Sequence, residues 1–258
     1  MRRAIVVLLF PFLALMACSR GSAPSQPAAR ERTLTVLGAA SLTDAFQAIG
    51  RRFEARHDGV TIRFSFGPSD GLAQQLQQGA PADLFASASS KWMDAVAGDP
   101  GVGHRADFAR NRLTVVVPTS NPAGITALAD LAKPGVRLVL AAEGVPAGDY
   151  ARDILDNAGI SRAALANLVS NEIDVKGVLQ KVAAGEADAG IVYVTDVTPV
   201  VRGQVTAIPI PDAVNVIATY PIAVVAGSRD PGLALRFERY VLGPGQSELR
   251  RAGFLPAA

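Results

Sequence analysis

Short apolar runs alternate with segments of helical periodicity along the chain from residue 34 to its end. The short runs have the length of buried β-strands, whereas apolar residues that recur every three or four positions line one face of an amphipathic helix. This alternation predicts an α/β architecture with largely parallel strands. The expected strands span residues 34–37, 61–66, 83–86, 113–117, 136–141, 189–193, 204–208 and 221–225.

The segment after Ser41 shows the helical spacing most clearly, because its apolar residues recur three or four apart until residues 57–59 interrupt them. Similar spacing predicts helices over residues 150–158, 175–182 and 233–242. Each of these helices is expected to pack its apolar stripe on a sheet. The sequence shows no internal repeat.

Two expected strands are almost continuously apolar and flank a central block of the chain, at residues 113–117 and 222–225. A chain that passes twice between two lobes needs a hinge strand at each crossing. We therefore expect one lobe to contain residues 32–113 and 222–258. The second lobe, residues 114–221, is expected to be inserted into the first.

The first 17 residues have the pattern of a secretory signal, since Arg2 and Arg3 precede an apolar stretch that is short for a membrane span. The signal ends in Leu-Met-Ala-Cys, which resembles the bacterial lipobox and predicts acylation of Cys18. The alternative for this only cysteine is a buried free thiol in an uncleaved helix. Residues 18–31 lack periodicity and predict a flexible tether. We thus expect a lipoprotein anchored in the periplasm or cell envelope.

The net charge of +2 comes from Arg2 and Arg3, so the chain after the predicted signal is formally neutral. No run of basic residues appears, and nucleic acid is therefore not an expected partner. Bulk electrostatic attraction is likewise excluded as the means of capturing a ligand. Two histidines and one cysteine are too few for a zinc or iron centre, and we expect no cofactor.

Two serines follow expected strands and precede expected helices. Ser41 stands three residues before Asp44, the spacing of a capping box, and Ser69 precedes a helix expected over residues 72–78. Each serine is either an ordinary helix cap or a ligand for an anion, because a helix start directs unpaired N–H groups and a positive dipole end toward one point.

Residues 67–71 also match the Gly-x-Ser-x-Gly nucleophile elbow of α/β-hydrolases, with Ser69 as nucleophile. A hydrolase of that fold needs an acid and then a histidine later in the chain. The only histidine after Ser69 is His104, 35 residues on, which leaves little room for the intervening strands. A serine hydrolase therefore remains only as an alternative, and His57 and His104 are expected to be solvated.

A series of motifs makes the sequence resemble one family. The motifs are Ala-Ala-Ser-Leu-Thr-Asp-Ala (39–45), Gly-Ala-Pro-Ala-Asp-Leu-Phe (79–85) with Lys-Trp-Met (91–93), Val-Pro-Ala-Gly-Asp-Tyr-Ala (145–151), Asp-Val-Lys-Gly (174–177), Gly-Ile-Val-Tyr (190–193) and Gly-Phe (253–254). This series is similar to that of the periplasmic molybdate-binding proteins of ABC transporters.

The resemblance implies a type II periplasmic-binding-protein fold with two lobes, each a mostly parallel sheet flanked by helices, joined by hinge strands. It implies no enzymatic activity and no cofactor. It further implies that a monomer captures molybdate, and tungstate too, and delivers it to an ABC permease in the inner membrane. A receptor for sulfate or another tetrahedral oxyanion is the alternative within the same class.

The resemblance also places five ligands for the oxyanion. Ser41 and Ser69 are expected to bind through hydroxyl and backbone N–H groups, Ala147 and Val175 through backbone N–H groups, and Tyr193 through its phenol. Molybdenum would be held only as molybdate, with no side chain bonded to the metal. Such a site suits a dianion, because a tetrahedral oxyanion offers only acceptor lone pairs.

One position departs from the family pattern. Small hydroxyl residues usually surround the second serine, whereas Pro68 and Asp70 flank Ser69 here. Proline lacks an N–H donor, and a carboxylate next to a bound dianion repels it unless the carboxylate faces solvent. We expect Asp174 to cap the helix that begins at Val175. Trp92 is expected to be a core residue rather than a sensor of the ligand.

Overall fold

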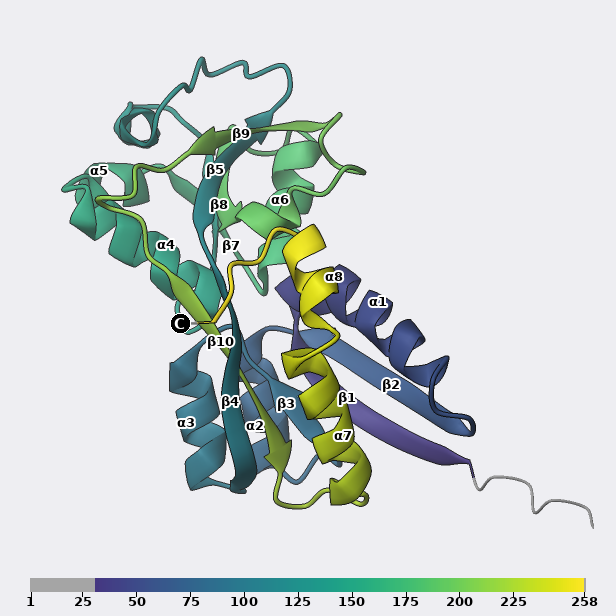
Figure 1. Ribbon diagram of the computed structural model, residues 1–258. Coiled ribbons are helices and arrows are strands. Elements are labelled where there is room, and N and C mark those ends of the chain that lie inside the picture. The colour runs from purple at the N-terminus through teal and green to yellow at the C-terminus, as the bar shows by residue number, and fades with distance from the viewer. Residues whose placement is uncertain (1–30, 258) are drawn as a thin grey trace, which may run out of the picture. The chain divides into compact units, whose positions relative to one another are not determined.

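The computed structural model describes residues 31–257, and its strands form two five-stranded sheets flanked by helices (Figure 1). The first sheet has the order β2-β1-β3-β10-β4 and the second β7-β6-β8-β5-β9. We call residues 31–111 and 218–257 the first half and residues 112–217 the second half. The strands are β1 (Arg32–Ala39), β2 (Val60–Gly67), β3 (Leu84–Ala86), β4 (Val102–Asn111) and β10 (Ala218–Val225) in the first sheet, and β5 (Leu113–Pro118), β6 (Leu138–Ala141), β7 (Leu168–Glu172), β8 (Ala189–Tyr193) and β9 (Val205–Pro209) in the second.

Helices cover both faces of the first sheet. Helices α1 and α7 bury Phe46, Phe53 and Phe237 against one face, and α2 and α3 bury Leu72 and Met93 against the other. The apolar stripe expected after Ser41 is the buried face of α1. The helices are α1 (Thr43–Glu54), α2 (Ser69–Gln77), α3 (Ser90–Gly98), α7 (Pro231–Leu242) and α8 (Gln246–Arg251) in the first half and α4 (Pro146–Asn157), α5 (Ser161–Leu165) and α6 (Val175–Ala183) in the second, with short 3₁₀ helices η1 (Ala40–Leu42), η2 (Leu128–Ala132) and η3 (Val194–Asp196).

Each sheet has one strand that runs against the others. In the first sheet, β1 is parallel to β2 and β3, whereas β10 is antiparallel to both β3 and β4. In the second sheet, β6 is parallel to β7 and β8, whereas β5 is antiparallel to β8 and β9. The reversed strand in each case is the one that enters from the other half. The sheets are therefore mixed, a detail that the expectation of mostly parallel sheets did not include.

The chain crosses between the halves at Arg112 and again at residues 210–217. We placed the second crossing four residues later, but residues 218–221 pair with β4 and belong to the first sheet. The apolar run that identified this strand begins only at Pro221, and proline ordinarily weakens the case for a strand. Here a shift of register between Tyr220 and Pro221 accommodates the proline inside β10.

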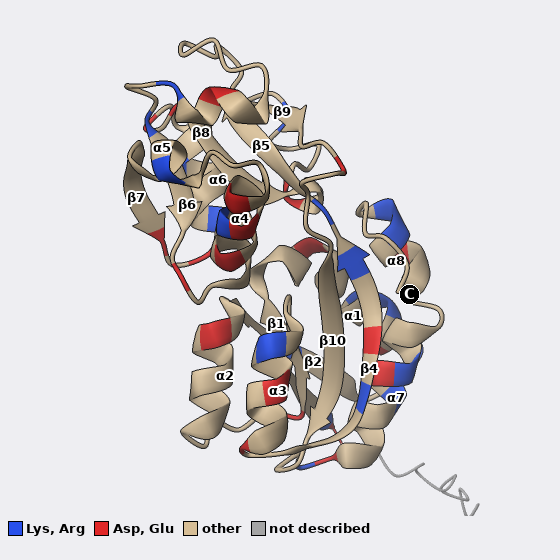
Figure 2. Ribbon diagram, turned by 90° about the vertical axis from the view of Figure 1, so that its left-hand side faces the viewer, with Lys and Arg blue, Asp and Glu red and all other residues tan. Residues whose placement is uncertain are grey.

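All eight expected strands are present, but β4 and β7 were missed. Both lie at the edge of a sheet, where one side of the strand is solvated and polar residues interrupt the apolar pattern. Acidic and basic residues are intermixed along the ribbon of both halves, in keeping with the neutral composition after the predicted signal (Figure 2). Among the described residues no helix is long and apolar enough to cross a membrane. The predicted signal, Cys18 and all of the predicted tether except Glu31 lie outside the described residues.

The two sheets have the same strand order although the sequence shows no repeat. In both, two neighbouring parallel strands deliver the chain to a helical turn: β1 leads to η1, β2 to α2, β6 to α4 and β7 to α6. Parallel strands end at the same edge of their sheet, so the helix starts of each half gather at one edge. The candidate functional site lies where the helix starts of the two halves meet.

Candidate functional site

A small cavity of about 20 Å³ lies where these helix starts meet, and both halves contribute to its wall. All five residues that we expected to bind the ion line it: Ser41, Ser69, Ala147, Val175 and Tyr193. No lysine or arginine is among its lining residues, and Asp174 is the only acidic one. The cavity is therefore walled mainly by uncharged groups. The role of the five residues as ligands stays a prediction.

Ser41 is not the helix cap that one of its two interpretations proposed. It lies in η1, between β1 and α1, and the N-cap of α1 is Leu42, which makes no side-chain capping bond. The Ser41 hydroxyl instead lies 3.0 Å from the hydroxyl of Tyr220. Thr43 closes the local turn by donating its hydroxyl to the carbonyl of Ala40 at 2.7 Å. The Ser41 side chain is thus free of the helix.

Ser69 does not cap its helix either. It is the first residue of α2, follows the N-cap Pro68, and is almost fully buried. Its hydroxyl oxygen accepts a hydrogen bond of 3.0 Å from the backbone N–H of Ala88. A hydroxyl whose oxygen accepts from an N–H group keeps its own hydrogen to donate. Ser69 can therefore present a donor to the cavity.

The flanking residues of Ser69 affect the cavity unequally. Pro68 lines the cavity and its carbonyl accepts the Leu72 N–H of α2 at 3.0 Å. Asp70 does not line the cavity, although its Oδ1 is buried without a hydrogen-bond partner in the described part of the chain. The carboxylate that departs from the family pattern thus lies outside the cavity wall.

Ala147 and Val175 contribute backbone rather than side-chain chemistry. Ala147 lies in the first turn of α4, and Val175 is the first residue of α6. N–H groups in the first turn have no acceptor within their helix. The side chain of Asp174 accepts the N–H of Gly177 at 2.9 Å, which confirms the expected cap. The Val175 N–H is left to the cavity.

Tyr193 provides a buried hydroxyl that makes no ordinary hydrogen bond to another described residue. It ends β8 with 1% of its surface exposed, and its hydroxyl has no hydrogen-bond partner among residues 31–257. Burial raises the pKa of Tyr193 well above its ordinary value, so the phenol keeps its proton. An unpaired buried hydroxyl lowers the free energy of unfolding by about 1–3 kcal/mol. Such a group is therefore uncommon in a folded protein unless it has a function. A ligand in the cavity would supply the missing acceptor.

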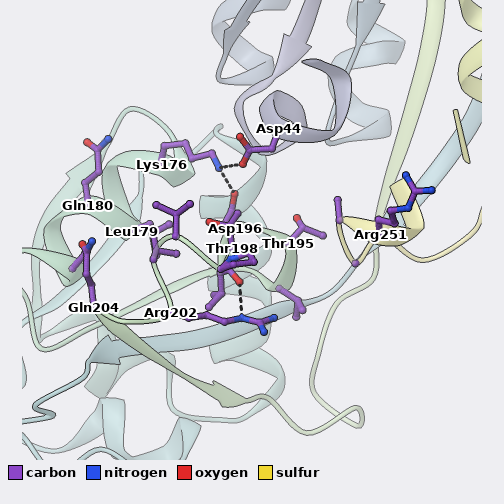
Figure 3. A pocket seen from close by; sticks show the side chains of 18 of the residues that line it. Asp44, Lys176, Leu179, Gln180, Thr195, Asp196, Thr198, Arg202, Gln204 and Arg251 are labelled. Carbon is purple, nitrogen blue, oxygen red and sulfur yellow. Dashed lines mark hydrogen bonds and ion pairs between the residues drawn. The ribbon is translucent and has the colours of Figure 1, made fainter. Parts of the chain in front are cut away.

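Lys176, which follows Val175 in the sequence, is already paired with carboxylates. Lys176 Nζ lies 3.3 Å from Asp196 Oδ1 and 3.9 Å from Asp44 Oδ2, in a separate groove shown in Figure 3. Lys176 does not line the small cavity. Two carboxylates therefore pair with its charge, and no lysine or arginine lines the cavity itself.

Comparison with known proteins identifies the family. Residues 34–255 match the bacterial extracellular solute-binding protein family. The chain belongs to this family. This membership confirms the prediction of a binding protein rather than an enzyme. The solute-binding protein is also similar to the molybdate-binding protein ModA of Mycobacterium bovis, with 42% identity over 246 residues that cover 93% of this chain and 92% of the relative.

Solved structures confirm the predicted type II fold. The periplasmic molybdate-binding protein of Azotobacter vinelandii has a TM-score of 0.75 at 19% identity and covers 87% of this chain and 100% of its own. The sulfate-binding protein SubI of Mycobacterium tuberculosis has a TM-score of 0.74 at 20% identity and covers 87% of both chains. Because proteins named for two different oxyanions match equally well, the fold does not choose between the ions.

The hydrolase alternative lacks a base next to Ser69. His57 stacks on Phe53 with ring centroids 3.9 Å apart, and His104 Nδ1 lies 2.8 Å from a carboxylate oxygen of Glu238. Neither histidine lines the cavity of the solute-binding protein. Within residues 31–257 no group of three or more His, Cys, Asp or Glu side chains is placed to hold a metal ion.

Asp196 holds the backbone of Tyr193 and makes the stability of the fold depend on pH. Its Oδ2 accepts the backbone N–H of Tyr193 at 3.1 Å. Burial raises the pKa of Asp196 from 3.8 to about 6, although Lys176 opposes this shift. An acid with a higher pKa in the folded state binds its proton more tightly when folded. Protonated Asp196 thus stabilises the fold below about pH 4, and this contribution is lost as the pH rises through 6.

Asp196→Asn is expected to remove this pH dependence. The Tm of the wild type relative to the variant should fall as the pH rises from 4 to 7, because only the wild type must ionise a buried carboxyl. Thermal unfolding at several pH values measures the difference. Asp94→Asn, on the exposed side of α3, is the control and should follow the wild type. A constant difference between wild type and Asp196→Asn across this range would contradict the prediction.

Proposed function

We propose that this solute-binding protein captures molybdate, and tungstate too, and delivers it to an ABC importer. The observation that carries the proposal is a cavity walled by helix-start N–H groups and hydroxyls from both halves, without a cationic side chain. The similarity to a protein named for molybdate binding supports the choice of ion.

Neutral donors suit such a dianion. Each hydrogen bond to a charged group contributes about 1.5–3 kcal/mol, and each helix start adds about 0.3–1 kcal/mol. Several of these together can offset the desolvation of the ion without a counter-ion. A wall of donors would also disfavour protonated anions such as hydrogen phosphate, whose proton needs an acceptor. Asp174 is the one lining residue that could supply an acceptor, and its Oδ1 is already used by the N–H of Gly177.

The cavity has room for about one water molecule and must widen to hold an oxyanion. Contacts that join the halves beside it offer the means. The Trp92 indole N–H donates to the Gly144 carbonyl at 2.7 Å, and Lys91 Nζ lies 3.0 Å from Asp149. Trp92 is therefore partly buried at the junction of the halves and is not the core residue that we expected. We infer that the halves part and close around the ion.

Molybdate is expected to stabilise the protein far more than sulfate does. At a hundredfold excess over Kd a ligand adds about 2.7 kcal/mol, which is about 5–10 °C in Tm for a protein of this size. Calorimetry gives Kd, and the fluorescence of Trp92, the only tryptophan, reports movement at the junction. Equal or greater stabilisation by sulfate would favour the sulfate receptor, and no effect of any oxyanion would refute the proposal.

Tyr193→Phe is expected to weaken molybdate binding by about tenfold, because the variant loses one donor to a charged ligand. The ring remains and a buried hydroxyl without a partner is removed, so the Tm without ligand should equal or exceed that of the wild type. Tyr240→Phe is the matched control, because Tyr240 is a residue of α7 that does not line the cavity and its hydroxyl contacts Arg56. Unchanged affinity of Tyr193→Phe by calorimetry would remove Tyr193 from the site.

The cellular setting completes the proposal. The family consists of bacterial extracellular solute-binding proteins, and the solved structures similar to this chain include a periplasmic binding protein. We infer that acylated Cys18 anchors the protein to the cell envelope and that the monomer presents the closed halves to its permease. The formally neutral composition after the signal supports short-range recognition of the ion rather than long-range attraction.

A further inference from the structure

A buried chain of polar side chains leads away from the cavity behind Ser41. The Ser41 hydroxyl lies 3.0 Å from that of Tyr220, and Asn111 Nδ2 lies 3.5 Å from the Tyr220 hydroxyl and 2.8 Å from Thr195 Oγ1. Tyr220 is in β10 and is fully buried, and Asn111, at the end of β4, is 1% exposed. Neither lines the cavity. Both were invisible as site residues in the sequence.

The direction of these hydrogen bonds follows from the backbone next to Asn111. The N–H of Arg112 donates to Asn111 Oδ1 at 2.9 Å. A backbone N–H can only donate, so the oxygen of the amide must face it and the NH₂ group faces Thr195 and Tyr220. An NH₂ group offers hydrogens and no acceptor. The hydrogen of Tyr220 cannot point toward it.

Tyr220 therefore has one acceptor for its hydrogen in the described part of the chain, namely Ser41 Oγ. Burial raises the pKa of Tyr220 well above its usual range, so that hydrogen stays in place. Once Ser41 Oγ accepts from Tyr220, the hydrogen of Ser41 is left over. No other hydrogen-bond partner of the Ser41 hydroxyl exists among residues 31–257, and the cavity is the space that it lines.

We propose that Tyr220, oriented by Asn111, is a positioning residue that fixes the Ser41 hydroxyl as a hydrogen-bond donor to the bound oxyanion. The inference rests on the proposed function of the cavity. The selectivity of the site would then depend partly on Tyr220 and Asn111, which do not line the cavity themselves. A serine hydroxyl that is free to rotate can offer either its hydrogen or a lone pair, whereas one that already accepts from Tyr220 presents its hydrogen.

Asn111, Tyr220 and Ser41 thus form a relay of hydrogen bonds that ends at the cavity. The ring of Tyr220 is fixed by its neighbours, so the part that its hydroxyl plays in this relay can be tested by substitution. Its centroid lies 5.4 Å from that of Phe254, 5.8 Å from that of Tyr193 and 6.2 Å from that of Phe108, in edge-on packing. Tyr220→Phe keeps this packing and deletes only the hydroxyl. Thermal unfolding without ligand verifies that the variant is folded.

A double-mutant cycle on Ser41 and Tyr220 tests the proposal, with Kd for molybdate measured by calorimetry. Tyr220→Phe should weaken binding about fivefold when Ser41 is present and less than about twofold in the Ser41→Ala background, since Tyr220 acts through Ser41. The ratio of phosphate affinity to molybdate affinity should rise in Tyr220→Phe alone. Tyr240→Phe again serves as the control for loss of a tyrosine hydroxyl.

Asn111→Asp provides an independent route. A carboxylate accepts the Tyr220 hydrogen and withdraws it from Ser41, so the variant should lose more affinity with Ser41 present than in the Ser41→Ala background. Repulsion by the new charge acts in both backgrounds and cancels in the cycle.

Equal losses from Tyr220→Phe in the two backgrounds, or no loss in either, would overturn the relay while leaving the proposed function intact. If the wild type binds sulfate instead of molybdate, the same cycle is run with sulfate and decides in the same way. Failure of the wild type to bind molybdate, tungstate or sulfate would overturn both the proposed function and the relay.

Discussion

Val175→Pro is expected to weaken molybdate binding by about a hundredfold and to leave the fold intact. Proline removes the N–H group that we expect to bind the ion, and its ring occupies the position of that hydrogen. The loss of a bond to a charged ligand plus this obstruction corresponds to about 2.7 kcal/mol.

The first position of a helix tolerates proline well, because its N–H has no helical acceptor there. Val175 is the first residue of α6, and Asp174 before it is extended, with φ −154° and ψ 176°. An extended conformation is the one that a residue before proline prefers. The cap from Asp174 uses the N–H of Gly177 and survives the substitution. The variant therefore tests a backbone donor with little disturbance of the helix.

Val175→Ala is the matched control, since it keeps the N–H and shortens a side chain that is 3% exposed. We expect it to lower stability by about 1–2 kcal/mol while the affinity stays within about twofold of the wild type. Calorimetry and thermal unfolding of both variants separate the two effects. If alanine weakened binding as much as proline does, the side chain rather than the N–H would be responsible.

Gly148→Ala is expected to damage both stability and binding. A Cβ at this position would lie 2.1 Å from the carbonyl oxygen of Ala142 and 2.4 Å from that of Ala141, distances that no real contact allows. The start of α4 must then move away from the end of β6, and the neighbouring Ala147 moves with it.

Overpacking of this kind against backbone costs about 3 kcal/mol or more, which lowers Tm by about 6–12 °C for a protein of this size. Molybdate affinity should fall at least about tenfold with the loss of the Ala147 donor. Gly98→Ala is the control, because nothing lies within 4 Å of a Cβ at that helical position. Its Tm should equal or slightly exceed that of the wild type. A wild-type Tm for Gly148→Ala would contradict the argument.

Much of the fold was predictable because it depends on local periodicity. The eight expected strands and the helix at Thr43–Glu54 follow from apolar spacing. Edge strands such as β4 were missed because polar residues on their solvent-exposed side interrupt that spacing. The match of the motifs placed the five cavity residues. Their side-chain types alone gave no signal at Ala147 and Val175, since only a backbone N–H is used there.

The capping interpretations were wrong for a physical reason. A cap is a local bond, whereas the hydroxyls of Ser41 and Ser69 bond to Tyr220 and Ala88, which are 179 and 19 residues away. Competition between local and distant partners is settled by the tertiary structure and leaves no trace in a short sequence window. Asn111 and Tyr220 were missed for the same reason.

The place of β10 between β3 and β4 has a consequence for the order of synthesis. The second half is one continuous segment, but the first sheet stays divided until residues 218–225 have been made, because β3 and β4 are joined only through β10. A growing chain therefore cannot complete the core of its first half until residues 218–225 have left the ribosome. The signal predicted at residues 1–17 implies export of an unfolded chain, and for such a chain this delay would postpone folding until after export.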